Sequence, residues 1–132
     1  MNKIQAKNML NDVVEHFSSN PTELRSKSSR GCFYNSQVNK PKSIGCAIGM
    51  YISNENAIYL DDHCGSIDAA FDDGYIDNLT LYSKLPKWMQ KMDVNFLSDI
   101  QNLHDSDVNW TNTTISEKGK QTVQAIIKQF QL

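Results

Sequence analysis

The sequence has few of the residues that build disulfide or zinc frameworks. Its 132 residues include only three cysteines, Cys32, Cys46 and Cys64, and no two of them form a C-x-x-C pair. An odd number of cysteines argues against a disulfide framework. The missing C-x-x-C pairs argue against a zinc ribbon. We therefore expect reduced thiols, in a chain long enough to fold without a disulfide or a metal.

Long apolar runs are also missing. No stretch approaches the roughly 18 apolar residues that a membrane-spanning helix needs, and the first residues lack the apolar segment of a secretion signal. Hydrophobic residues make up 39% of the chain, which is rather low but typical of a globular protein and not of a disordered one. The sequence thus predicts one cytoplasmic domain over residues 1–132, with no cofactor and no membrane contact.

Apolar periodicity predicts several helices. Residues 3–18 carry apolar side chains at the i, i+3, i+4, i+7 spacing of an amphipathic helix. Residues 93–105 show a similar pattern, with Asp93 as the expected cap. The last helix should begin at Thr114, because Thr114 and Glu117 form a capping box. Shorter helical segments are expected at 22–25, from Cys46, at 67–71 after Ser66, and from Leu85.

One short β-hairpin is expected between the first helix and the middle of the chain. Its strands would be residues 31–35 and 43–46, joined by the turn residues 39–42. The predicted fold class is mainly α, a small helical domain with a short hairpin, and an α+β arrangement is the alternative. The residues expected to share the core are Phe17, Ile48, Ile100, Leu103, Ile126 and Phe130.

Cys46 is the strongest candidate for a catalytic group. A cysteine at the start of a helix faces the positive end of the helix dipole, which favours the reactive thiolate. His104 could then serve as the base, with Asp105 or Asp107 to orient it. A cysteine packed in the core is the preferred interpretation, because buried cysteines are common. We therefore expect a protein that is not an enzyme, and keep a Cys46-dependent hydrolase or transferase as the alternative.

Two groups of residues contain metal-ligating side chains. One combines Cys32, Cys46, His104 and Asp105, and the other is the Asp-Asp-His-Cys run at 61–64. Neither has the ligand spacing of a recognised zinc finger. We expect no bound metal, and a metal-stabilised interaction module is the second alternative.

Charge is unevenly distributed along the chain, although the net charge is only −2. Residues 1–53 carry seven Lys or Arg against three acids, whereas residues 54–77 carry seven acids and no Lys or Arg. Such segregation can orient a charged partner, and it also suits a homo-oligomer. The net acidity argues against general nucleic-acid binding. The predicted partner-binding residues are Arg25, Lys27, Arg30, Tyr34, Lys40 and Lys42.

Three motifs together resemble a group of small uncharacterised proteins of phages, prophages and other mobile elements. The motifs are C-x-Y at 32–34, C-A-I-G at 46–49 and F-L-x-x-[LI]-Q-x-x-H-D at 96–105. The chain departs from this pattern after Ile52, where Ser53 stands at a position that usually holds proline. The resemblance implies a phage or mobile-element setting and no particular reaction. A short chain without a strong catalytic motif suits stoichiometric binding, so we expect an accessory protein that acts by binding. Its partner would be a host factor, such as a defence or replication protein, or a small anionic ligand.

Overall fold

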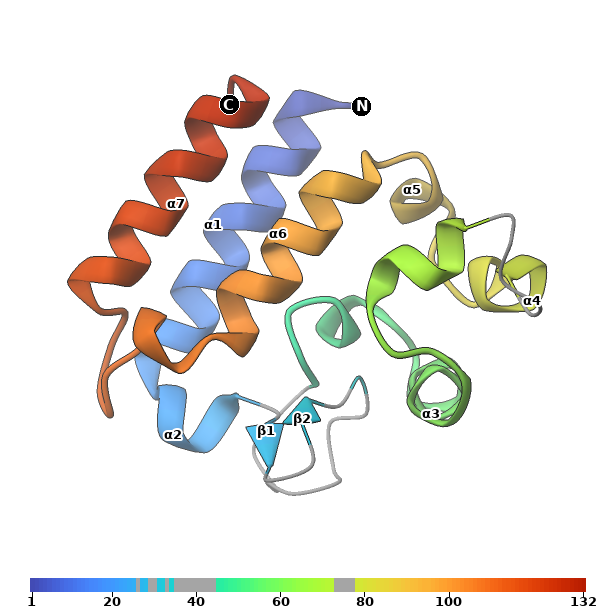
Figure 1. Cartoon of the computed structure of the whole chain (residues 1–132), viewed down its shortest axis with the longest axis horizontal. Coiled ribbons are helices and arrows are strands. Elements are labelled where there is room, and N and C mark those ends of the chain that lie inside the picture. The colour runs from blue at the N-terminus through green and yellow to red at the C-terminus, as the bar shows by residue number, and fades with distance from the viewer. Residues whose placement is uncertain (26, 29–30, 33, 35–44, 73–77) are drawn as a thin grey trace.

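The computed structural model describes residues 1–25, 27–28, 31–32, 34, 45–72 and 78–132 (Figure 1). Within these residues the chain forms seven α-helices, three short 3₁₀ helices and one pair of two-residue strands. The prediction of a mainly helical fold is confirmed. Among the same residues, no helix is long and apolar enough to cross a membrane.

Three long helices form one side of the molecule. They are α1 (Lys3–Ser19), α6 (Val94–Asp105) and α7 (Glu117–Phe130), and each contacts the other two. Figure 1 shows them side by side, with both chain ends at the same end of the bundle. The helices predicted over 3–18 and 93–105 are therefore confirmed. Asp93 caps α6 as expected, because its Oδ1 accepts a hydrogen bond from the Asn95 amide at 2.8 Å.

The start of α7 differs from the prediction. Its cap is Ser116, whose Oγ accepts a hydrogen bond from the Gly119 amide at 3.0 Å. Thr114 instead closes a turn, in which its amide donates to Thr111 Oγ1 at 3.0 Å. The predicted capping box at Thr114 is wrong because this turn already uses the Thr114 backbone.

Several of the shorter helices form the other side of the molecule. Figure 1 shows α3 (Asn54–His63) and α4 (Asn78–Ser83) on the far side of α6 from α7, with α5 (Lys87–Gln90) near one end of α6. The sequence predicted neither α3 nor α4. The other short elements are η1 (Gly49–Tyr51), η2 (Ile67–Phe71), α2 (Pro21–Leu24), which contacts α1, and η3 (Asp107–Asn109), which contacts α6 and α7.

The strands pair differently from the predicted hairpin. β1 (Lys27–Ser28) runs antiparallel to β2 (Gly31–Cys32), with Lys27 opposite Cys32. The expected second strand at 43–46 is not supported, because Gly45 and Cys46 lie outside any strand. Residues 35–44, which include the predicted turn, lie outside the described residues.

The predicted core is confirmed for five of its six residues. Phe17, Ile48, Ile100 and Leu103 are fully buried, and Ile126 is 3% exposed. Phe130 lies at the margin of the same cluster, where it is only partly buried. Its ring packs edge-on against Phe96, with a centroid distance of 5.4 Å. One continuous core therefore joins the long helices to the shorter ones.

Candidate functional site

Gly49 of the C-A-I-G motif and the neighbouring Gly45 pack against the backbone of Tyr34. Gly45 and Gly49 lie so close to it that a Cβ at either position would be 2.2 Å from the Tyr34 carbonyl oxygen. Gly45 also has a φ of +96°, which side-chain-bearing residues rarely adopt. The glycine of C-A-I-G is thus required by close packing against Tyr34, which is the last residue of C-x-Y.

The Tyr34 side chain connects this packed region to α6 through hydrogen bonds. Its hydroxyl donates to the Gly65 carbonyl at 2.8 Å and accepts from Gln101 Nε2 at 2.9 Å. Gln101 Oε1 in turn accepts from the Ile67 amide at 2.9 Å. Tyr34 is 3% exposed, so these bonds satisfy polar groups that burial removes from water. We call Tyr34, Gly45, Gly49 and Gln101 the Tyr34 cluster, and its geometry is that of a structural support.

Cys46 lies in the core beside this cluster. It is 1% exposed, and its Sγ accepts a hydrogen bond from the Gly49 amide at 3.3 Å. Only the three-residue η1 follows it, so no long helix supplies the expected dipole. Burial raises the pKa of the Cys46 thiol to about 12, against an ordinary value of 9.0. The thiol is therefore protonated at neutral pH and is a poor nucleophile.

We expect this buried thiol to make stability depend on pH. Between pH 9 and pH 12 the unfolded thiol releases its proton while the folded thiol retains it, so the free energy of unfolding falls as pH rises. Urea unfolding should show a loss of roughly 1 kcal/mol from this group between about pH 8 and about pH 10. Cys46→Ala should lack this part of the loss. An equal fall in both proteins would mean that the thiol is not a buried neutral group.

His104 and Asp105 form the pair that the sequence suggested. His104 Nδ1 lies 2.8 Å from Asp105 Oδ1, and the imidazole is fully buried. The ring also packs edge-on against Phe17, at a centroid distance of 4.7 Å. Asp105 could orient His104 as a base, but both the imidazole and the Cys46 thiol are buried. The described geometry thus favours packing over catalysis for all three residues.

Arg25 serves the fold. It is 9% exposed, and its Nε donates to the His104 carbonyl at 2.8 Å. Its Nη2 donates to the Asp105 carbonyl and to Asp107 Oδ1, each at 3.1 Å. These carbonyls end α6, where a cation is favoured by the helix dipole. The prediction that Arg25 binds a partner is therefore not supported.

The other predicted partner-binding residues divide into two groups. Tyr34 is buried in the cluster described above, so its predicted contact with a partner is not supported either. The Lys27 side chain, Arg30, Lys40 and Lys42 lie outside the described residues.

The candidate metal ligands have local partners. In the 61–64 run, His63 stacks on Tyr59 at a centroid distance of 4.2 Å, and Cys64 Sγ donates to the Ser66 carbonyl at 3.3 Å. Among the described residues no group of three or more His, Cys, Asp or Glu side chains could hold a metal ion. The Cys32 side chain lies outside the described residues.

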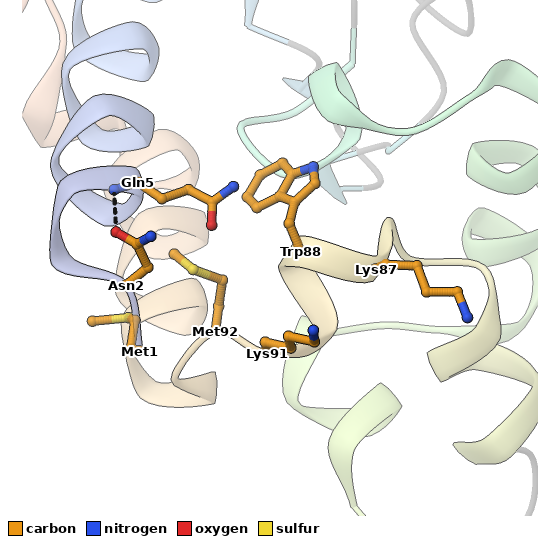
Figure 2. A pocket seen from close by; sticks show the side chains of 7 residues that line it. All are labelled: Met1, Asn2, Gln5, Lys87, Trp88, Lys91 and Met92. Atoms are coloured by element: carbon orange, nitrogen blue, oxygen red, sulfur yellow. Dashed lines mark hydrogen bonds between the residues drawn. The ribbon is translucent and has the colours of Figure 1, made fainter.

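A cleft that the sequence did not predict lies between the start of α1 and α5 (Figure 2). Its volume is about 430 Å³, and a second cleft of about 250 Å³ adjoins it, because Gln5 and Trp88 line both. We call the two together the Trp88 groove. The larger cleft is lined by Met1, Asn2, Gln5, Lys87, Trp88, Lys91 and Met92. The smaller cleft is lined by Gln5, Asn8, Met9, Asp12, Tyr51 and Trp88.

The groove has a positive and a negative end. Lys87 and Lys91 are exposed in the larger cleft, where no acidic residue is among the described lining residues. Asp12 lines the smaller cleft, with its Oδ2 3.5 Å from the Tyr51 hydroxyl. Burial, and then the Asp12 charge, raise the pKa of Tyr51 well above its ordinary value. Trp88 lies between the two ends.

Part of this groove has a signal in the sequence. Lys87 and Lys91 are four residues apart on either side of Trp88, and Asn2, Gln5, Asn8 and Asp12 follow helical spacing on α1. That spacing predicts two polar faces. It does not predict that α1 and α5 face each other, because the two segments are about 80 residues apart in the chain.

Comparison with known proteins identifies no relative. No protein-family model, no curated protein and no solved structure matches the chain. The function must therefore be inferred from the chain's own residues, and the resemblance to phage proteins stays a prediction.

Proposed function

We propose that the protein binds a small anionic ligand in the Trp88 groove and does not convert it chemically. One observation carries this proposal: the open cleft holds a half-buried Trp88 beside Lys87 and Lys91, and neither lysine pairs with a described residue. Small-molecule sites are typically concave, with an aromatic wall and a few convergent polar groups. The groove has each of these properties.

The charges of the groove favour an anion over a cation. Lys91 gives one end of the groove a positive charge, and Lys87 adds a second one nearby, although Figure 2 shows its side chain extending away from the indole. The only carboxylate among the described lining residues, that of Asp12, lies in the other cleft. Catalysis is less well supported, because the pKa of Cys46 leaves that residue protonated at neutral pH. A Cys46-dependent hydrolase or transferase is therefore the weaker hypothesis.

The resemblance to phage and mobile-element proteins is compatible with this function. An accessory protein could sequester a small anionic signal of its host by stoichiometric binding. Such a role needs a site of moderate size and no reactive group, which agrees with the groove.

Binding of a host protein is the second candidate function. It is favoured by the acidic stretch at 54–77, where the described carboxylates of Glu55, Asp62, Asp68 and Asp72 are exposed. These residues lie on or beside α3 and η2 and could meet a basic surface of a defence or replication factor. Charge reversal at Glu55 and Asp62 should weaken capture of such a partner if this candidate is correct.

We expect at least one small anion to stabilise the protein against heat. Suitable probes are inorganic phosphate, pyrophosphate, citrate and AMP, measured by thermal unfolding. A ligand present at a hundred times its Kd adds about 2.7 kcal/mol to the free energy of unfolding, which is a rise of several degrees. The rise should disappear in a variant that combines Trp88→Ala with Lys91→Glu.

The matched control is Lys118→Glu, which makes the same charge change on an exposed residue of α7, outside the groove. This variant should keep the full stabilisation. The proposal is wrong if the anion stabilises the Trp88 and Lys91 variant as well as it stabilises the unaltered protein.

A further inference from the structure

We propose that the ligand of the Trp88 groove is a nucleotide, with its base against the Trp88 indole and its phosphate beside Lys91. This inference rests on the proposed function and adds the chemical class of the ligand. It follows from three parts of the groove: an aromatic wall, a primary amide that faces this wall, and the separation of charge between the two ends.

The aromatic wall is fixed in orientation. The Trp88 ring packs edge-on against Tyr51, with a centroid distance of 5.4 Å and an interplanar angle of 87°. Because Trp88 lines both clefts, its indole lies at the centre of the groove. A tryptophan held in this way suits base stacking, which accepts any nucleobase because every base has a π face.

The primary amide of Gln5 faces the indole. Figure 2 shows the Gln5 side chain extending across the cleft toward Trp88. Asn2 lies beside it, and its Oδ1 accepts a hydrogen bond from the Gln5 backbone amide at 3.1 Å, while no described residue accepts from its NH₂ group. Glutamine and asparagine amides match the donor and acceptor pattern on the edge of a nucleobase. A base stacked on Trp88 would therefore find hydrogen-bonding groups at its edge.

The separation of charge selects a ligand with two different ends. Lys91 suits a phosphate, whereas the Asp12 carboxylate suits a hydrogen-bond donor such as an exocyclic amine. Gln5 and Asp12 are seven residues apart on α1, which is about 10 Å along the helix axis. A small inorganic anion would use only the lysine end. A nucleotide carries a phosphate, a planar base and donor groups in one molecule.

Calorimetric titration with AMP, adenosine and inorganic phosphate tests this inference. AMP should bind at least about tenfold more tightly than either fragment, because only AMP uses both the indole and Lys91. Trp88→Ala should weaken the binding of AMP by at least about tenfold and leave the affinity for phosphate unchanged. Lys91→Glu should weaken the binding of AMP and of phosphate and leave the affinity for adenosine unchanged. Lys118→Glu is again the control, and it should bind all three like the unaltered protein.

Two results would overturn the inference. If AMP binds no more tightly than phosphate, the base is not recognised, although the proposed function survives when phosphate binding still requires Lys91. If a short glutamate-rich peptide binds more tightly than AMP and requires Lys91, the ligand is an acidic peptide. Circular dichroism should confirm that each variant folds, and Trp88→Leu replaces Trp88→Ala if the alanine variant does not.

Discussion

Gly49→Ala should prevent stable folding or lower the free energy of unfolding by more than about 3 kcal/mol. The added Cβ would lie 2.2 Å from the Tyr34 carbonyl oxygen and 2.7 Å from the Tyr34 Cα. Both are backbone atoms, so no side chain can rotate away to make room. A shift of Tyr34 would disturb the hydrogen bonds that its hydroxyl makes with Gly65 and Gln101. Urea unfolding followed by circular dichroism measures the effect.

Gly65→Ala is the control for this substitution. A Cβ at Gly65 would meet no atom within 4 Å, so this variant should change the free energy of unfolding by about 0.5 kcal/mol or less. The carbonyl of residue 65 would still accept the Tyr34 hydroxyl. Similar stabilities for the two alanine variants would mean that Gly49 is not packed against Tyr34.

Ile100→Ala should lower the free energy of unfolding by about 2–5 kcal/mol, because it removes buried carbon atoms and leaves a cavity. Ile100 is fully buried in α6. Ile58→Ala is the matched control, since Ile58 is 47% exposed on α3. Ile58→Ala should lower the free energy of unfolding much less. An unchanged thermal midpoint for Ile100→Ala would contradict the assignment of this residue to the core.

The long helices that the sequence predicted are those with a continuous row of buried apolar side chains. In α1 and α6, apolar side chains recur at helical spacing and are buried as that spacing requires. α3 was missed because only Ala57 and Leu60 are buried in it, while Ile58 is exposed. Two buried residues give too weak a period to recognise a helix. Part of its support comes from distant contacts, such as the Tyr34 amide bonding to Asp61 Oδ1 at 2.6 Å.

The candidate site was harder to predict than the fold. The sequence correctly placed His104 beside an acidic partner, because Asp105 is its neighbour in the chain. It could not show that Cys46 is buried, and burial is what raises the thiol pKa. It also could not show the Trp88 groove. That groove depends on α1 packing near α5, and no local pattern encodes this contact.

The Tyr34 cluster bears on what the three motifs would say about ancestry if another protein shared them. Its residues belong to, or lie next to, the three motifs, and they hold the core together through steric fit and buried hydrogen bonds. The residues that line the Trp88 groove all lie outside those motifs. Selection for folding and selection for ligand choice would therefore act on separate sets of positions. Two proteins that share these motifs could inherit one architecture from a common ancestor and still recognise different molecules.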